Sequence, residues 1–146
     1  RNFENMEGLE PINYLYKIAK KNNPNIKFIN KNIFKIKSNK RYDLISCIGV
    51  LQNCELSPLL FLNKICKILK KNGYLFLTSK NINWIKLKSK NYFLEREHSW
   101  FDINEVKMVL KKNNLKIIKS KGLLPKEKKI THEKLSHTFY IWAKKN

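Results

Sequence analysis

The stretch KICKILKKNGYLFLTSKN, Lys64–Asn81, joins an amphipathic segment to a short apolar one through a single Asn-Gly pair. Apolar residues at helical spacing predict a helix in the first segment, and Gly73 is expected to end it as a left-handed cap. YLFLTS, residues 74–79, has the continuous apolar character of a strand buried on both faces. We expect this strand to deliver Thr78–Asn81 to the ligand-binding edge of an α/β sheet.

The same alternation of strands and helices extends along the chain. Strands are expected at 4–10, 26–30, 42–51, 74–79, 115–124 and 137–145, and helices at 12–22, 58–72 and 103–113. Asp102 is placed to cap the last helix, with Glu105 completing a capping box. The final strand alternates apolar and polar residues, which favours an edge or hairpin position. The pattern predicts one α/β domain, residues 1–146, with a doubly wound, mostly parallel sheet and an antiparallel C-terminal strand.

The charge of the chain is strongly positive. It has 31 Lys and Arg residues against 11 Asp and Glu, a net charge of +20, and all but three of the basic residues are Lys. Such a charge is the electrostatic signature of proteins that bind nucleic acid or an anionic membrane. The lysines are spread along the whole chain, however, together with many Asn and Ile residues. We therefore favour a compositional origin, and nucleic-acid binding stays a less favoured alternative.

Cysteine and histidine usage points to a cytoplasmic protein without a metal site. The three cysteines lack CxxC spacing, and Cys47 and Cys66 lie in apolar patterns typical of reduced core residues. His132 and His137 have no metal-ligand spacing with other residues. No apolar run approaches the ~18 residues needed to span a membrane, and there is no signal peptide. Because the sequence opens with Arg1 and not Met, we expect a fragment.

Several segments, in their order and spacing, carry a resemblance to a known family. They are FENMEGLEP (3–11), NIKFINKNIF (25–34), RYDLISCIGVLQN (41–53), FLNKICKILKKNGYLFLTSKN (61–81) and EHSWFDINEVKMVLKKNNLKIIK (97–119). Together they resemble the class I S-adenosylmethionine-dependent methyltransferases after their first strand and helix. The resemblance implies a Rossmann-like sheet and S-adenosyl-L-methionine as cofactor.

The family's glycine-rich loop is missing from this sequence. The only glycines are Gly8, Gly49, Gly73 and Gly122, and they do not form a GxGxG-type turn. The resemblance implies a sheet that is incomplete at its N-terminus, without its central first strand and the main seat for the donor's methionine part. Truncation, a piece supplied by a partner, or a degraded copy would each explain this, and we favour truncation. We expect the 146-residue chain alone to bind the donor poorly.

The first candidate donor-binding residues follow the two N-terminal strands. Glu10 and Pro11 stand at the carboxyl end of the first strand, where a carboxylate accepts hydrogen bonds from both ribose hydroxyls. The alternative is a solvated surface glutamate. Asn32 matches a position where the family often carries an Asp bonded to the adenine amine, and Ile33 would pack on the ring. Asn32 is equally well explained as a turn residue.

Cys47, Ile48 and Gly49 lie at the end of the strand at 42–51, and are candidate donor contacts. Gly49 would let the backbone approach a ligand closely. Gln52 and Asn53 stand where family members often have a Glu-His pair, which removes an obvious acid or base. A core role explains Cys47 better than a nucleophilic one, because no basic group is near it in sequence.

His98, in REHSWFD, is the candidate catalytic residue. It would accept a proton from a substrate hydroxyl or amine, although a loop histidine bonded to backbone is the more common case. Four aromatic residues either form an apolar substrate wall or simply cover the sheet: Trp84, Tyr92, Trp100 and Phe101.

The activity that follows from the resemblance is methyl transfer to O, N or C of a small-molecule acceptor. Transfer from a sulfonium is an in-line displacement in which the protein mainly aligns the reactants. A base is needed only when the acceptor must lose a proton, so the residues do not identify the acceptor. Two alternatives remain: an inactive methyltransferase-like remnant, and an RNA-directed methyltransferase or RNA-binding module.

Overall fold

The structure is a computed structural model that describes residues 5–37, 39, 41–54, 57–84, 99–124 and 128–146. The chain divides into two compact units, Arg1–Lys40 and Arg41–Asn146. The segment 81–100 is polar, aromatic and irregular in sequence, which predicts a loop with some helix, and most of it lies outside the described residues. No helix in the described part of the chain is long and apolar enough to cross a membrane.

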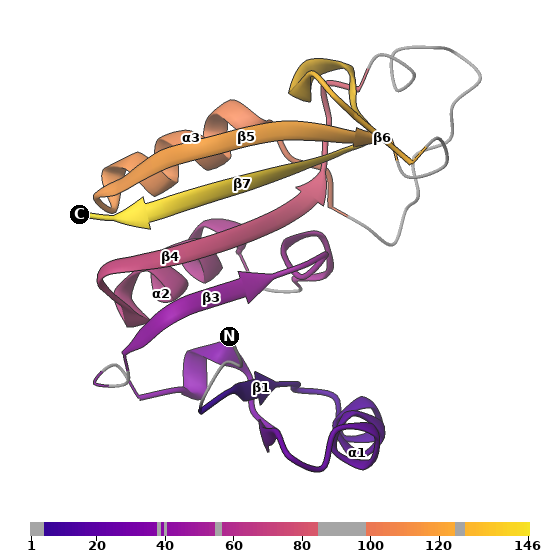
Figure 1. Cartoon of the computed structure of the whole chain (residues 1–146), viewed down its shortest axis with the longest axis vertical. Helices are drawn as coiled ribbons and strands as arrows, with labels where there is room; N and C mark the ends of the chain where they lie inside the picture. Colours follow the sequence, from indigo (N-terminus) through magenta and orange to yellow (C-terminus); the bar gives the residue numbers. More distant parts are fainter. Residues whose placement is uncertain (1–4, 38, 40, 55–56, 85–98, 125–127) are drawn as a thin grey trace. The chain divides into compact units, whose positions relative to one another are not determined.

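The first unit is built around a two-stranded parallel sheet (Figure 1). Strand β1, Glu7–Leu9, runs beside β2, Lys27–Ile29, and the connection contains helix α1, Asn13–Asn22. A 3-10 turn, η1, Ile33–Lys35, follows β2. Because the two strands are parallel, their carboxyl ends lie at the same edge. The chain leaves this edge at Glu10 and at residues 30–32.

The second unit contains a five-stranded mixed sheet in the order β3-β4-β7-β5-β6. Its elements are β3 (Tyr42–Cys47), η2 (Leu51–Asn53), α2 (Pro58–Ile68), β4 (Leu69–Lys80), α3 (Ile103–Lys112), β5 (Leu115–Leu124), β6 (Lys129–Thr131), η5 (Glu133–Leu135) and β7 (Thr138–Lys145). β3 pairs parallel with β4, and β7 runs antiparallel to both β4 and β5. β3, β4 and β5 therefore share one direction, which confirms the predicted α/β fold with an antiparallel C-terminal strand.

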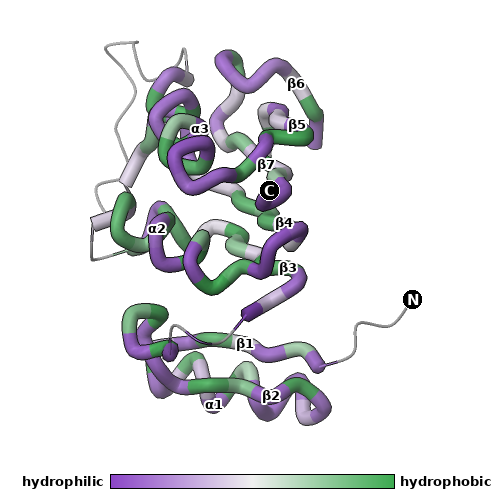
Figure 2. Tube along the Cα trace, turned by 90° about the vertical axis from the view of Figure 1, so that its left-hand side faces the viewer, coloured by the Kyte–Doolittle hydropathy of each residue, from purple (hydrophilic) through white to green (hydrophobic). Residues whose placement is uncertain are grey.

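Figures 1 and 2 both show that helices α2 and α3 cover the same face of this sheet. The residues beneath them are fully buried: Leu75 and Leu77 of β4, and Phe139, Ile141 and Ala143 of β7. Asp102 begins α3 as predicted, and its side chain accepts a hydrogen bond from the backbone of Asn104 at 2.7 Å. This helix-covered face holds the core of the second unit.

The predicted edge position of the last strand is wrong, whereas its antiparallel pairing with β5 agrees with the hairpin alternative. β7 lies in the middle of the sheet, between β4 and β5. Its alternation of buried and half-buried residues has a different cause. One face of β7 packs against α2 and α3, whereas the other carries aromatic and lysine side chains. A central strand with one helix-covered face therefore has the alternating sequence pattern that we attributed to an edge strand.

The turn from α2 into β4 differs from the predicted cap. The helix ends at Ile68, and Asn72, not Gly73, takes the left-handed conformation with φ 62°. Gly73 is required for a different reason, because a β-carbon there would lie 2.9 Å from the Lys70 carbonyl oxygen. The ammonium group of Lys145 donates hydrogen bonds to the carbonyls of Cys66 and Leu69, at 2.6 and 2.9 Å, and so stabilises the C-terminal end of α2.

The sequence YDLISCIGVL, residues 42–51, is apolar almost throughout and predicts a strand covered on both faces, and this prediction is wrong for β3. It is the edge strand of the five-stranded sheet, and its residues Asp43, Leu44 and Ser46 are exposed. The strand is also shorter than predicted and ends at Cys47. Gly49 adopts a φ of 67°, a conformation that favours glycine and turns the chain out of the sheet.

Candidate functional site

Glu10 stands at the carboxyl edge of the small parallel sheet, as the sequence predicts. Its backbone N–H donates to the carbonyl of Ile29 at 3.1 Å, and its carboxylate accepts from the Ile12 backbone N–H at 2.9 Å. The side chain of Asn30 donates to the carbonyls of Glu10 and Pro11, at 2.8 and 3.1 Å. These bonds fix the Glu10-Pro11 segment against the end of β2 and hold the carboxylate at the strand tip.

Asn32 lies at the same edge, just before η1. Its side-chain oxygen accepts from the backbone N–H of Phe34 at 3.1 Å, so it caps this turn. The turn role that we weighed against adenine binding is thus present in the structure. The carbonyl oxygen has a second lone pair, and the side-chain amide supplies two donors. Asn32 and the half-buried Ile33 therefore remain proposed adenine contacts.

The ends of β3 and β4 come together in the second unit. The backbone N–H of Gly49 donates to Thr78 Oγ1 at 2.9 Å, and the Gly49 carbonyl accepts from the Asn53 side chain at 2.8 Å. A β-carbon on Gly49 would have no other atom within 4 Å, so its surroundings are open. Ile48 is 69% exposed. The three-residue segment 47–49 thus presents backbone and an apolar side chain at the carboxyl edge.

Cys47 is buried in the core and is not a nucleophile at neutral pH. Burial, with a smaller contribution from Cys66, raises the pKa of its thiol to about 12. Such a thiol stays protonated at neutral pH, and the thiolate is the reactive form. The structure therefore agrees with the core role that the sequence favoured, and any donor contact of Cys47 involves its backbone or an apolar surface.

Aromatic side chains gather at the carboxyl end of β4. The rings of Trp84 and Trp100 pack edge-on against His137, with centroid distances of 4.6 and 5.2 Å. Lys80 Nζ lies 5.1 Å from the centroid of the Trp100 ring, and burial lowers the pKa of this lysine. Trp84 and Trp100 thus lie together at this edge, and their role in a substrate wall stays a prediction.

His137, which we did not select from sequence, is the histidine that the described structure places at this edge. Its carbonyl accepts from the backbone N–H of Asn81 at 3.0 Å. The available signal was the position of His137 directly before β7. When two strands pair antiparallel, the start of one lies beside the end of the other, so the start of β7 lies beside the end of β4. His98 and Tyr92 lie outside the described residues, and the catalytic role of His98 stays a prediction.

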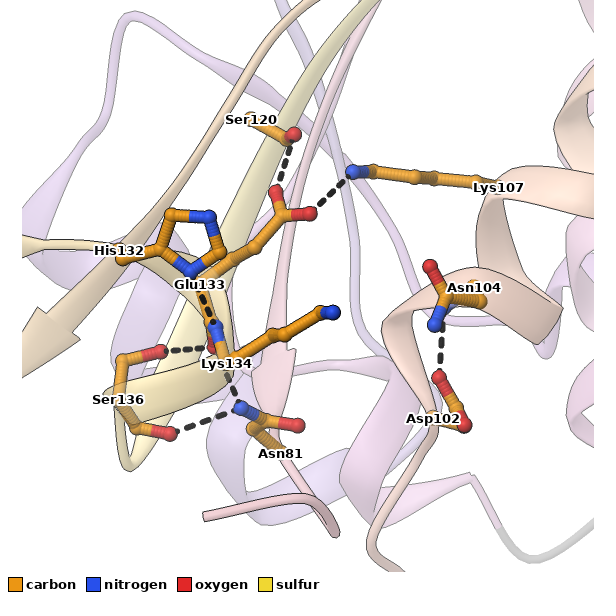
Figure 3. A network of polar contacts seen from close by, with 9 residues as sticks. All are labelled: Asn81, Asp102, Asn104, Lys107, Ser120, His132, Glu133, Lys134 and Ser136. Atoms are coloured by element: carbon orange, nitrogen blue, oxygen red, sulfur yellow. Dashed lines mark hydrogen bonds and ion pairs between the residues drawn. The ribbon is translucent and has the colours of Figure 1, made fainter. Parts of the chain in front are cut away.

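A polar network anchors the segment that leads into β7 (Figure 3). The Glu133 carboxylate accepts hydrogen bonds from Lys107 of α3, at 2.6 Å, and from the Ser120 hydroxyl of β5. Asn81, fully buried at the end of β4, donates to the carbonyls of Glu133 and Ser136 at 2.6 and 2.9 Å. The network therefore ties η5 to α3, β4 and β5, and positions the edge that carries His137.

The stability of this network is expected to depend on pH. Burial raises the pKa of Glu133, but hydrogen bonds from Lys107 and Ser120 outweigh it and lower the pKa below its ordinary value. A carboxyl whose pKa is lowered by folding stabilises the protein above its unfolded-state pKa, and loses that contribution as pH falls through its folded pKa. The urea midpoints of wild type and Glu133→Gln should thus differ most above about pH 5, and converge as the pH falls below the ordinary glutamate pKa of about 4.3. A difference that stays constant over this range would contradict the assignment.

Comparisons with known proteins place the chain among methyltransferases. A family model described as a methyltransferase domain matches residues 1–120. No curated protein sequence matches the chain significantly.

Several solved methyltransferase structures are similar in fold to this chain. An S-adenosylmethionine-dependent methyltransferase from Clostridium acetobutylicum matches with a TM-score of 0.74 at 12% identity, over 99% of this chain and 76% of that one. A possible histamine N-methyltransferase from Thermotoga maritima gives 0.74 at 17% identity, over 97% and 73%. Magnesium protoporphyrin IX methyltransferase from Synechocystis, with bound S-adenosylhomocysteine, gives 0.71 at 13% identity, over 96% and 64%. These matches confirm the Rossmann-like fold, and the names of the proteins agree with the predicted cofactor.

Proposed function

Because this chain belongs to the methyltransferase domain family, we propose that it takes part in S-adenosylmethionine-dependent methyl transfer to a small-molecule acceptor, at O, N or C. We also propose that residues 1–146 belong to a single domain, since the family match covers the whole first unit and most of the second. The donor supplies an activated methyl group, and the protein binds and orients the reactants.

The observation that carries the proposal is the position of Glu10. Its carboxylate stands at the tip of a parallel strand, held there by the bonds to Ile29 and Ile12. A carboxylate in this place fits the two hydroxyls of a ribose. In the same unit, Pro11, Asn32 and Ile33 are proposed to contact the adenosine part.

In the second unit, the proposed donor contacts are Cys47, Ile48 and Gly49. The open surroundings of Gly49 and the exposed side chain of Ile48 support this role. For the acceptor, we propose the wall formed by Trp84 and Trp100. His98 and His137 are the candidate proton acceptors for substrates that must lose a proton. The ring of His137 packs against Trp84 and Trp100.

Glu10→Gln is expected to weaken donor binding about tenfold. The amide keeps an oxygen for the Ile12 N–H, so the local turn is preserved. It removes the charge that strengthens the bonds to the ribose, and a charge-assisted hydrogen bond is worth about 1.5–3 kcal/mol. Saturation-transfer NMR with S-adenosylhomocysteine measures the affinity even if binding to this chain is weak.

Glu105→Gln is the matched control, because Glu105 is an exposed glutamate on α3. It should leave the affinity unchanged. Equal affinities of wild type and Glu10→Gln would show that the ribose contact is wrong. A complete absence of binding would contradict a donor site on this chain.

A further inference from the structure

A lysine and a histidine lie around one indole ring at the carboxyl end of β4. Lys80 Nζ lies 5.1 Å from the centroid of the Trp100 ring, and the His137 ring lies 5.2 Å from the same centroid. Lys80 is 7% exposed, and it pairs with Thr138 of β7, the residue that follows His137. We name these residues, together with Trp84, the edge cluster: Lys80, Trp84, Trp100, His137 and Thr138.

The imidazole of His137 is held in place from several sides. Thr138 Oγ1 lies 3.0 Å from His137 Nδ1, and the tautomer of the ring decides which of the two atoms donates. Trp84 and Trp100 pack nearly perpendicular to the imidazole, at 89° and 84°. When Nδ1 carries the proton and donates to Thr138, the lone pair of the neutral ring is on Nε2. His137 is then oriented as a base through Nε2.

The charge of the edge cluster favours an acceptor that becomes negative as it reacts. Burial lowers the pKa of Lys80, and a negative charge nearby stabilises such a desolvated ammonium group. The described acidic residues closest to the cluster in sequence have other partners: Asp102 caps α3, and Glu133 accepts from Lys107 and Ser120 (Figure 3). β4 and β7 contain no acidic residue. A hydroxyl that loses its proton is stabilised here, whereas an amine that becomes a cation is repelled.

We propose that the methyl acceptor is a phenol, that His137 takes the phenol proton, and that Lys80 stabilises the phenol oxygen. The inference rests on the proposed methyl transfer and narrows it from O, N or C to O. A phenol has a pKa of about 10, as in tyrosine, and its ring suits the aromatic surface of Trp84 and Trp100.

The proposed step is balanced by the residues of the edge cluster. The acceptor oxygen forms a bond to the methyl carbon as the bond from that carbon to sulfur breaks, and the electron pair of the broken bond stays on sulfur. The phenol proton goes to Nε2 of His137. The products are an aryl methyl ether and S-adenosylhomocysteine. Thr138 is a positioning residue, because it acts on the acceptor only through His137.

Two probes of matched shape, 4-nitrophenol and 4-nitroaniline, test the acceptor class on the full chain. They differ only in the hydroxyl and the amine, and the absorbance of 4-nitrophenol reports whether the hydroxyl is ionised. We expect 4-nitrophenol to bind at least about tenfold more tightly, because its oxygen forms a charge-assisted hydrogen bond that the amine lacks. The bound probe should ionise at a lower pH than the free probe. Equal affinities, tighter binding of 4-nitroaniline, an unshifted ionisation, or no binding of either probe would overturn the proposal.

Lys80→Met keeps the apolar stem of the side chain and removes its charge. It should reduce the affinity for 4-nitrophenol about tenfold and raise the pH at which the bound probe ionises. Lys144→Met is the matched control, because Lys144 Nζ lies 5.8 Å from the centroid of the Tyr74 ring, at the opposite end of the β4–β7 pair. Equal losses in the two variants would mean that net charge alone attracts the probe, and would overturn the proposal.

Nitrogen-15 NMR of the imidazole tests the positioning role of Thr138. The neutral ring of His137 should carry its proton on Nδ1 in wild type and in Thr138→Ser, and should shift toward the Nε2–H form in Thr138→Val. The signals of His137 are those that disappear in His137→Gln, a variant that should also abolish the shifted ionisation of bound 4-nitrophenol. A proton on Nε2 in wild type would contradict the role of His137 as the base.

The two proposals fail separately, because the probe measurements contain no donor. A failed probe measurement overturns the phenol acceptor and leaves the donor site as proposed. A failed measurement of S-adenosylhomocysteine binding overturns the proposed function, whatever the probes show.

Discussion

Replacing Asn81 by leucine is expected to reduce the free energy of unfolding of the second unit by about 3–5 kcal/mol. Asn81 is fully buried and joins the end of β4 to the segment before β7. Leucine has a similar volume but leaves the Ser136 carbonyl and the Asn83 N–H without this partner. The Glu133 carbonyl keeps the hydroxyl of Ser136. Urea denaturation followed by far-UV circular dichroism measures the loss.

Asn104→Leu makes the same substitution on an exposed position of α3 and is the control. Only the backbone of Asn104 bonds to the Asp102 side chain, and the substitution leaves that bond in place. We expect a change within about 0.5 kcal/mol. Similar midpoints for the two variants would mean that the Asn81 bonds do not anchor this edge.

Gly122→Ala is expected to destabilise the second unit by about 3 kcal/mol or more. A β-carbon there would overlap the side chain of Ser136, and would lie 2.7 Å from the carbonyl oxygen of His132. Ser136 cannot move away freely, because its hydroxyl donates to the Glu133 carbonyl. Overpacking of this kind costs about 1–3 kcal/mol, and more where the neighbours are fixed. Thermal and urea unfolding both report the change.

Gly49→Ala separates crowding from backbone strain. At Gly49 an added β-carbon meets no atom within 4 Å, but φ is 67°. Only the conformational cost of about 1–2 kcal/mol is therefore expected. If Gly122→Ala were no more destabilising than Gly49→Ala, the close packing of β5 against the η5 segment would be disproved.

Local signals predicted the elements of the second unit well. Asp102 and the helical spacing after it predicted α3, and the apolar runs predicted β4 and β5, because caps and periodicity act over a few residues. The position of β7 was not predictable in this way. Its alternation reflects buried residues on the face that α2 and α3 cover and half-buried residues on the other face, and it does not distinguish a central strand from an edge strand.

The candidate site was predictable only where strand order alone places a residue. The positions of Glu10 and Asn32 at one edge were predictable because Glu10 directly follows β1 and Asn32 lies in the turn after β2, and these two strands run in parallel. His137 and the Lys107–Glu133 pair were missed, since they depend on pairing between segments far apart in the sequence.

The most direct test of the central claim is to map S-adenosylhomocysteine binding onto the backbone amides of the labelled chain by NMR. The account predicts that shifts concentrate at the strand ends, at Glu10–Asn13 and Asn30–Phe34 in the first unit and at Cys47–Gly49 in the second, and that Glu10→Gln reduces them. Shifts confined to other parts of the chain, or the same shifts with the same affinity in Glu10→Gln, would contradict it.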